Sequence, residues 1–300
     1  MGRLREAGAP LAHERIVAMY NYRLLEKLLF LPFHRLNEKR LEAACRHKTV
    51  LITGASSGIG EKLAFKLGYL PVHLILVARR GDKLLAMKRD IERSSARVSV
   101  YRADLRNAGE REGLLSMIHR LPDGIDIVVS NAGLSINRSI MDSLDRNHDF
   151  TRTMAINYFA PVELLLSLMP LLKSTQGHVI NISTINTSLA PLPGWAAYQA
   201  SKTAFDTWLR SASPELHGAG IATTSIYFPL VRTPMIEPTA AYSQMPAMSP
   251  EHAADIIAKS MYARRRTWMP WWLPFGQLVS VLFRGALERA AARKLRGRGR

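Results

Sequence analysis

The chain has 300 residues, a formal net charge of +17 and one cysteine, Cys45. This length is enough for one large α/β domain with extensions, and a hydrophobic content of 47% is ordinary for a globular core. A single cysteine excludes a disulfide framework within the chain and any zinc site built on several thiolates. We therefore expect a reducing compartment and no bound metal.

The positive charge is concentrated at the two ends of the chain. Residues 1–48 carry ten Lys or Arg and five Asp or Glu, whereas residues 260–300 carry ten and one. Residues 49–259 are nearly balanced, with 21 basic and 18 acidic side chains. Basic ends suit nucleic acid, an anionic membrane surface or an acidic partner. Nothing except charge points to nucleic acid, and we do not expect it as a partner.

The hydrophobic segments near the two ends fall short of a signal peptide and of a membrane span. The segment 17–33 is interrupted by Arg23, Glu26 and Lys27 and lacks the order of regions that a signal peptide has. The stretch 268–283 is shorter than the roughly 18 apolar residues of a spanning helix and contains two prolines. We expect a cytoplasmic protein, with a peripheral place on the inner face of the membrane left open.

The first predicted element is helical, because apolar residues recur near a 3.6-residue period over 10–45, with an interruption at Pro32. Short apolar runs then alternate with helical segments, two of which are predicted at 59–70 and 81–94. The predicted strands are 49–53, 72–78, 98–101, 125–130, 177–182 and 221–228. This alternation predicts an α/β fold with a doubly wound, Rossmann-type parallel sheet and helices on both faces.

A cluster of glycines follows the first predicted strand, in the turn Thr53-Gly-Ala-Ser-Ser-Gly-Ile-Gly60. Glycine allows a tight turn and a close approach of the backbone to a pyrophosphate, and the next helix offers free N–H groups and the positive end of its dipole. The strand, turn and helix occur in the required order. We therefore predict dinucleotide binding by Gly54, Ser56, Ser57, Gly58, Ile59 and Gly60.

The choice of dinucleotide is made about 20 residues further on, at the end of the second strand. An acidic residue there would bind the ribose of NAD, but this chain has Arg79 and Arg80. Two guanidinium groups suit the 2′-phosphate of NADP, which makes NADP(H) the predicted cofactor. Asp82 lies close by, and the two arginines could simply be solvated surface residues. NAD therefore remains an alternative cofactor.

Tyr198 and Lys202 lie four residues apart at the start of a predicted helix, so both side chains share one face. A free tyrosine has a pKa near 10, which is too high for efficient proton transfer at neutral pH. A neighbouring ammonium stabilises the phenolate and lowers that pKa. The pair alone is common on protein surfaces, but its surroundings favour a catalytic role.

These features resemble, in chain order, the short-chain dehydrogenase/reductase family over about residues 48–260. The resemblance implies that Asp104 and Leu105 lie beside the adenine and that Asn157 holds a water for proton relay. Three further segments match the family. Asn131, Ala132 and Gly133 would contact the cofactor, and Ser183 or Thr184 would supply a hydroxyl. The resemblance also implies contacts with the nicotinamide from Pro229, Val231 and Thr233. The implied division is a helical extension at 1–47, the catalytic domain at 48–260 and a basic, tryptophan-rich extension at 261–300.

The sequence departs from the family pattern at two places. The family has two serines at the end of the fifth strand, whereas this chain has Ser183 followed by Thr184, and Tyr198 lies one residue further along. We favour Ser183 as the hydroxyl that positions the substrate and leave Thr184 open. The usual Pro-Gly after the sixth strand is Pro229-Leu230 here, which stiffens that loop.

The resemblance implies a reaction in which NADPH gives a hydride to a carbonyl carbon. Ser183 or Thr184 and Tyr198 would then bind the carbonyl oxygen, where negative charge develops. Tyr198 would donate its proton, with Lys202 holding the ribose and Asn157 helping to restore the proton. Because Cys45 precedes the predicted fold, a covalent route through a reactive thiol is not expected.

Five stretches narrow the resemblance to bacterial fatty acyl-CoA reductases, namely 145–150, 152–154, 157–159, 226–235 and 249–255. They imply a fatty acyl-CoA or a fatty aldehyde as the substrate. A soluble ketoreductase acting on ketoacyl or steroid-like ketones remains an alternative. A non-catalytic NADPH-binding, membrane-associated protein is a second one, which the intact catalytic residues disfavour.

The C-terminal extension combines Arg264–Arg266, three tryptophans and a short apolar stretch. Aromatic residues beside arginines suit a membrane interface, from which an acyl chain could be delivered. A substrate lid or a subunit interface would explain the same tryptophans, and we expect a homo-oligomer. These readings stay open at the level of sequence.

Overall fold

The computed structural model describes residues 20, 22–30, 36–237, 239, 242 and 244–296. Within these residues the sheet has seven parallel strands in the order β3-β2-β1-β4-β5-β6-β7. The strands are β1 (Thr49–Thr53), β2 (His73–Ala78), β3 (Arg97–Arg102), β4 (Ile127–Ser130), β5 (His178–Thr184), β6 (Ala222–Phe228) and β7 (Thr267–Trp268). The chain runs outward from β1 to β3 and returns to β4, which places the point of reversal between β1 and β4. The predicted doubly wound sheet is confirmed.

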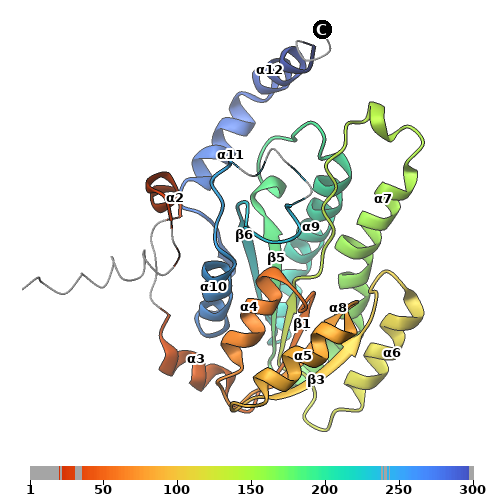
Figure 1. The fold of residues 1–300 in the computed structure, drawn as a ribbon, viewed down its shortest axis with the longest axis vertical. Coiled ribbons are helices and arrows are strands. Elements are labelled where there is room, and N and C mark those ends of the chain that lie inside the picture. The colour runs from red at the N-terminus through yellow and green to blue at the C-terminus, as the bar shows by residue number, and fades with distance from the viewer. Residues whose placement is uncertain are drawn as a thin grey trace, which may run out of the picture.

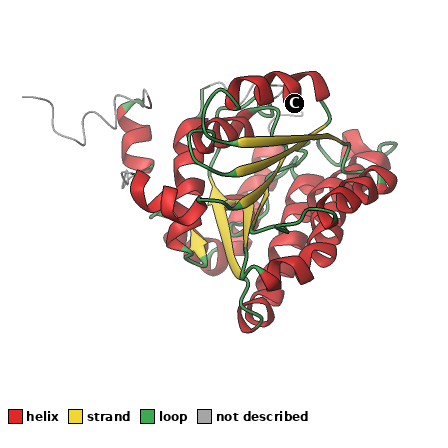
Figure 2. Ribbon diagram, turned by 90° about the horizontal axis from the view of Figure 1, so that it is seen from below, coloured by secondary structure: helices red, strands yellow, loops and turns green. Residues whose placement is uncertain are grey.

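Helices cover both faces of the sheet (Figures 1 and 2). Their bounds are α2 (Leu24–Leu29), α3 (Glu38–Cys45), α4 (Gly58–Leu67), α5 (Gly81–Ile91), α6 (Ala108–His119), α7 (Asn147–Met154), α8 (Ala160–Ser174), α9 (Ala196–Gly218), α10 (Pro250–Ala263), α11 (Leu273–Leu282) and α12 (Arg284–Arg296). Two short 3-10 turns, η1 (Met141–Ser143) and η3 (Ile185–Thr187), and one π-helical turn, η2 (Ala155–Phe159), complete the described elements.

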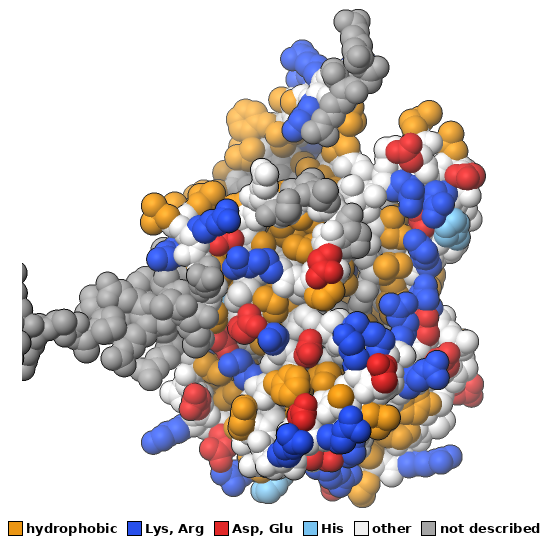
Figure 3. Space-filling view, in the orientation of Figure 1, with side chains coloured by type: hydrophobic (Ala, Val, Ile, Leu, Met, Phe, Trp, Pro, Cys, Tyr) orange, Lys and Arg blue, Asp and Glu red, His pale blue; other side chains and the backbone are white. Residues whose placement is uncertain are grey.

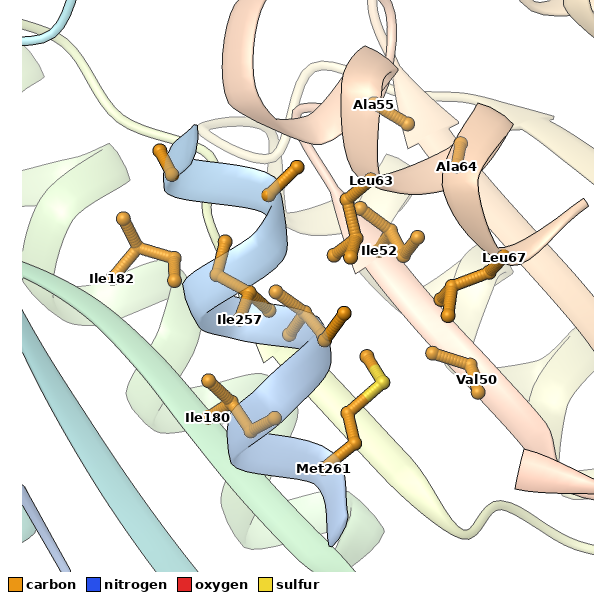
Figure 4. Close-up of a cluster of buried hydrophobic side chains, with 14 of the residues drawn as sticks. Val50, Ile52, Ala55, Leu63, Ala64, Leu67, Ile180, Ile182, Ile257 and Met261 are labelled. Atoms are coloured by element: carbon orange, nitrogen blue, oxygen red, sulfur yellow. The ribbon is translucent and has the colours of Figure 1, made fainter. Parts of the chain in front are cut away.

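Two hydrophobic clusters hold the layers together. The first joins α4, α5 and α10 to one face of the sheet, and the second joins α6, α8 and α9 to the other face. Figure 4 shows part of the first cluster, where Ile257 and Met261 of α10 face Leu63 and Leu67 of α4. Since both faces are covered, strands such as β1 and β5 are buried along their whole length, which explains their continuous apolar runs.

The region before β1 contains two helices, one on each side of the interruption predicted at Pro32. Residues 1–19, 21 and 31–35 lie outside the described residues, and the described part contains α2 and α3. Tyr20 donates a hydrogen bond to Asp255 of α10, and the Tyr22 hydroxyl lies 3.0 Å from Nδ1 of His252. This segment therefore packs on α10 and shares the first hydrophobic cluster.

One helical stretch, Asn147–Ser174, is long and apolar enough to cross a membrane by length and composition. In the fold it consists of α7, η2 and α8. Leu164, Leu165, Leu168 and Leu172 of α8 are buried in the second cluster against the sheet. The packing is that of a core helix in an α/β fold, so the stretch gives little support for a membrane span.

Candidate active site

The turn between β1 and α4 requires glycine at three positions. Gly54 and Gly58 adopt φ angles of +69° and +58°, in the left-handed region that side chains disfavour. A Cβ at residue 60 would lie 2.6 Å from the Gly54 carbonyl oxygen. The side chain of Ser57, the N-cap of α4, makes no capping hydrogen bond. The first amides of α4 are therefore not capped by that side chain, as an anion-binding helix N-terminus requires.

Residues Asn131 and Ala132 fasten the end of β4 to the end of β1. Both backbone N–H groups donate to the Thr53 hydroxyl at 3.0 Å, and the Asn131 amide donates to the Thr53 carbonyl at 2.9 Å. A Cβ at Gly133 would lie 3.1 Å from Oδ1 of Asn157 and 3.6 Å from Nζ of Lys202. The segment 131–133 thus lies between the glycine turn and the side chains of Asn157 and Lys202. We call the group of side chains around Tyr198, Lys202 and Asn157 the reacting end.

The two arginines after β2 have different environments. Nη2 of Arg80 donates to the carbonyl and the hydroxyl of Ser56, both at 3.0 Å, so Arg80 braces the glycine turn. Arg79 is exposed. A hydrogen bond from Arg106 holds the pKa of Asp104 below its usual value, and the charge of Arg79 contributes to that shift. Leu105, beside Asp104, is buried.

Tyr198 and Lys202 occupy the first two turns of α9. Nζ of Lys202 donates to the Ile182 carbonyl of β5 at 2.9 Å. Burial lowers the pKa of Lys202 to about 8, against the opposing charge of Asp206. Burial also raises the pKa of Tyr198 to about 12, while a hydrogen bond with the Thr184 side chain lowers it. The predicted lowering of the Tyr198 pKa by Lys202 is not among these effects.

Asn157 is held in place from two sides. Its Oδ1 accepts from the Leu134 N–H at 2.9 Å, and its amide donates to the Leu134 carbonyl and to the Ser201 hydroxyl, each at 2.9 Å. The residue lies in the π-helical turn η2, a distortion that occurs frequently at functional sites. The extra residue in the turn locally widens the helix where the asparagine meets α9.

The two candidate hydroxyls at the end of β5 face different partners. Ser183 donates to Oδ1 of Asp206 at 3.3 Å, whereas Thr184 is the hydroxyl whose hydrogen bonding lowers the pKa of Tyr198. Successive side chains of a strand point to opposite sides, so only one of the two can face the tyrosine. The geometry therefore favours Thr184 over Ser183, the residue that the sequence favoured.

Two aromatic residues that sequence reasoning missed stand beside Tyr198. The Trp195 ring lies edge-on to Tyr198 with centroids 5.9 Å apart, and it stacks on Tyr242 at 5.5 Å. Trp195 could have been noticed, because it closely precedes Tyr198 in the sequence. Tyr242 gives no such local signal, since it comes from the loop after β6.

That loop also reaches the glycine turn. A Cβ at Gly58 would lie 2.9 Å from Cγ2 of Thr233, so Thr233 lies over the turn. Val231 is buried and forms a parallel bridge with Met248, and Pro229 directly follows β6. The loop after β6 thus connects the glycine turn to the Trp195 and Tyr242 rings beside Tyr198.

The described residues therefore gather a hydroxyl pair, an amine and a fixed amide at the carboxyl ends of β4 and β5, beside a glycine-rich helix N-terminus. Such a set can bind a dinucleotide, donate hydrogen bonds to a carbonyl oxygen and transfer one proton. Among the described residues, no group of three or more His, Cys, Asp or Glu side chains could hold a metal ion.

Comparisons with known proteins agree with this arrangement. A fatty acyl-CoA reductase of Acinetobacter baylyi is 43% identical over 231 residues, covering 75% of this chain and 78% of that protein. A fatty acyl-CoA reductase of Mycobacterium tuberculosis is 38% identical over 218 residues, covering 72% and 74%.

Among solved structures, a short-chain dehydrogenase from Sphingobium yanoikuyae in complex with NADPH gives a TM-score of 0.68 at 23% identity, covering 83% of this chain and 95% of that one. A metagenomic short-chain oxidoreductase in complex with NADP gives 0.63 at 25% identity, covering 73% and 92%. A family model described as short chain dehydrogenase matches residues 48–243. The chain belongs to the short-chain dehydrogenase/reductase family of oxidoreductases.

Proposed function

We propose that this oxidoreductase is an NADPH-dependent fatty acyl-CoA reductase, which converts a long-chain acyl thioester to the aldehyde. The proposal depends on one observation. The hydroxyls of Tyr198 and Thr184 lie together near Lys202 and Asn157, next to the glycine-rich turn. The identity of 43% to a fatty acyl-CoA reductase supports the substrate class. A fatty aldehyde is the second substrate that the same site would take.

The residues of the cofactor end fit NADP(H). The Cβ-free cradle at Gly54, Gly58 and Gly60 leaves backbone room for a pyrophosphate, and Arg79 is free to meet a 2′-phosphate. Solved neighbours that hold NADPH or NADP support this choice. Replacement of Arg79 by alanine should weaken NADPH binding about tenfold and leave NADH binding unchanged. Equal losses for both cofactors would contradict the assignment.

Arg80 provides an internal control for that experiment. Because Arg80 bonds to Ser56 of the glycine turn, its replacement by alanine should weaken the binding of both dinucleotides. A variant that loses NADPH binding alone at position 80 would show that this guanidinium also reads the 2′-phosphate.

The reaction requires an oxygen-binding pair and a proton. Bound NADPH supplies the hydride to the carbonyl carbon. The Thr184 and Tyr198 hydroxyls donate hydrogen bonds to the carbonyl oxygen, on which negative charge develops. Tyr198 transfers its proton to that oxygen, and the resulting hemithioacetal releases the CoA thiol and leaves the aldehyde.

Lys202 makes that proton transfer possible near neutral pH. Burial raises the pKa of Tyr198 to about 12, so the phenolate needs a nearby cation. Lys202 has a pKa lowered to about 8 by burial and is mostly protonated at pH 7. Lys202 lies one turn after Tyr198 on α9, and we expect Asn157 to orient a water that returns the proton.

The thioester is reduced directly, without a protein thioester. Cys45 is the one cysteine of the chain. It is fully buried, burial raises its pKa to about 12, and it packs on Met261 of α10. A thiol in that place is neither ionised nor accessible, so it cannot act as an acyl acceptor.

A cluster of arginines near the reacting end supports a CoA ester over a free aldehyde. The buried carboxylate of Asp149 pairs with Arg138 at 3.0 Å, Arg146 at 3.3 Å and Arg152 at 2.8 Å. Three guanidinium groups therefore converge on one buried carboxylate. Arg138 and Asp149 line a small cavity together with Ala197, the neighbour of Tyr198. The cluster suits the phosphates of CoA.

The function is tested by NADPH oxidation with palmitoyl-CoA, hexadecanal and a cyclic ketone, together with chemical identification of the product. We expect hexadecanal from palmitoyl-CoA. Arg138→Ala with Arg146→Ala should raise the KM for palmitoyl-CoA and leave that for hexadecanal unchanged. Activity on the cyclic ketone alone would favour the ketoreductase alternative and contradict the proposal.

Long acyl chains partition into membranes, so we further propose a peripheral location on the anionic inner face of the membrane. The basic ends of the chain support this location. Two of the tryptophans that suggested it are engaged within the chain, because the Trp271 and Trp272 indoles donate to carbonyls of α2. A third, Trp268, lies in β7 and packs on Phe228.

A further inference from the structure

Two helices from opposite ends of the chain expose apolar side chains together. In α2, Leu24 is 85% exposed and Leu28 is 56% exposed. In α11, Val281 is 75% exposed and Leu282 is 66% exposed. Large apolar side chains in such number are unusual on the surface of a monomer and mark a contact surface. We call this set the α2–α11 surface, made of Leu24, Leu25, Leu28, Trp271, Phe275, Leu278, Val279, Val281, Leu282 and Phe283.

The two helices form one continuous surface because they are bonded to each other. The Trp271 indole donates to the Leu28 carbonyl and the Trp272 indole to the Leu29 carbonyl, each at 3.1 Å. Figure 1 shows α2 and α11 next to each other at the side of the fold from which α12 projects. In Figure 3, hydrophobic side chains gather over both helices.

This surface adjoins the mouth of the active site. Ser280 of α11 accepts from the Ala190 N–H at 3.1 Å, in the loop that leads to Trp195 and Tyr198. Glu26 of α2 is buried and accepts from the Ala247 N–H at 3.0 Å, in the loop that carries Tyr242. Both loops that frame the reacting end are therefore attached to the helices of the α2–α11 surface.

The charges around the surface identify its occupant. The exposed helix α12 directly follows α11 and carries five basic residues against Glu288, and Arg23, the N-cap of α2, is also exposed. A second copy of the chain docked here about a twofold axis would place like charges near one another. Anionic lipid headgroups beside an apolar layer match both the charge and the apolar face.

The arginines at 264–266 do not belong to this surface. Arg264 donates to the Gln176 carbonyl just before β5, at the amino-terminal edge of the sheet and away from the active site. These arginines are close to the tryptophans in the sequence, but they lie in a different part of the fold. The cations that accompany the α2–α11 surface are those of α12 and α2.

We propose that the α2–α11 surface lies in the interface of an anionic bilayer and presents the active-site mouth to the membrane. Helix α11 has ten residues and is about 15 Å long, which is too short to cross the hydrocarbon core, so it lies in the interfacial plane. The purpose of this docking, delivery of long acyl chains, rests on the proposed function. The lipid contact itself does not depend on which carbonyl is reduced.

The test is flotation of the full-length protein with vesicles of phosphatidylcholine alone and of phosphatidylcholine mixed with phosphatidylglycerol. We expect binding to the mixed vesicles, with partial release by salt. The triple variant Leu24→Ser, Leu25→Ser, Leu28→Ser should bind at least about a hundredfold more weakly, because it loses the apolar contact while its charge is unchanged. Removal of the residues after Phe283 should instead abolish the preference for the anionic vesicles.

A matched control uses exposed apolar residues elsewhere. Tyr69 is 75% exposed and Leu85 is 51% exposed, and both lie outside the α2–α11 surface. Tyr69→Ser with Leu85→Ser should bind vesicles like the wild type. Failure of the wild type to bind at low salt would overturn the proposal. Normal vesicle binding by the triple variant would also overturn it. If the triple substitution turned a dimer into a monomer without changing vesicle binding, a second copy of the chain would be the partner that covers the surface, and the proposal would again be wrong.

The vesicle experiment uses no substrate, so its outcome is separate from that of the proposed reductase activity. The triple variant should reduce a short, water-soluble acyl-CoA at the wild-type rate. Loss of vesicle binding with that activity intact supports the docking surface. Wild-type binding by a protein that reduces no acyl-CoA would sink the proposed function and leave the docking proposal standing.

Discussion

The reacting end and the α2–α11 surface obey opposite physical rules. Around Lys202 and Asn157, polar atoms are buried and each is fixed by a specific partner. On α2 and α11, large apolar side chains are exposed. A buried polar group costs free energy unless it is bonded, and an exposed apolar group is unfavourable unless something covers it. The first region therefore specifies chemistry, and the second indicates a partner.

Substitutions at the reacting end should have large effects on kcat. Substitutions on the α2–α11 surface should have smaller effects, mainly on KM and on the distribution of the protein between water and membrane. The largest should come from Tyr198→Phe, which removes the proton donor and leaves the ring in place. We expect kcat to fall by roughly a thousandfold or more, at the upper part of the range for general acid catalysis. Equilibrium binding of NADPH, measured by fluorescence, should be retained. Near-normal turnover would remove Tyr198 from the chemistry.

The next largest effect separates the two hydroxyls of β5. Thr184→Val should lower kcat about a hundredfold, because one donor to the developing oxyanion is lost. Ser183→Ala should cost less than about tenfold, since its hydroxyl faces Asp206. Thr184→Ser is the control and should restore most of the rate. The reverse ranking in steady-state kinetics would return the role to Ser183.

The pH profile tests the amine. The pKa of Lys202 is lowered to about 8 by burial, so the ammonium is present below that value and lost above it. The rate kcat/KM should therefore fall as the pH rises through about 8, approaching tenfold for each further unit. Lys202→Arg, whose guanidinium does not titrate in this range, should lower the rate and abolish this limb. A limb that persists in the variant would belong to another group.

A smaller effect should come from the link between the two regions. Glu26→Ala removes the acceptor of the Ala247 N–H and loosens the loop that carries Tyr242. We expect the KM for a long-chain acyl-CoA to rise about fivefold, the size of one hydrogen bond, with kcat almost unchanged. Glu26→Gln keeps the acceptor and should behave nearly like the wild type. A drop in kcat without a change in KM would show that α2 acts on the chemistry.

The two regions also differ in how far the sequence predicts them. The glycine turn follows from residues within one short segment, and the structure gives Gly54 and Gly58 the positive φ angles that explain it. Strand β1 was predicted with its observed bounds because a buried parallel strand has a continuous apolar run. Strand β7 was missed, since two residues carry no such pattern.

The remaining features depend on contacts that no local pattern encodes. The choice between Ser183 and Thr184 depends on which side of β5 faces α9, and one extra residue before Tyr198 hides that register. The bond from Trp271 to Leu28 joins residues 243 positions apart. The sequence contains both segments, but only the fold shows that their apolar side chains form one surface.

The central claim is that this chain transfers hydride from NADPH to the carbonyl carbon of a long-chain acyl-CoA. It is tested most directly with palmitoyl-CoA and NADPH that carries deuterium at the transferable positions of its nicotinamide, with the product analysed by mass spectrometry. The account predicts hexadecanal with deuterium on the aldehyde carbon, and almost none from Tyr198→Phe. Absence of labelled aldehyde from the wild type, with the label recovered instead in the alcohol of a ketone substrate, would contradict it.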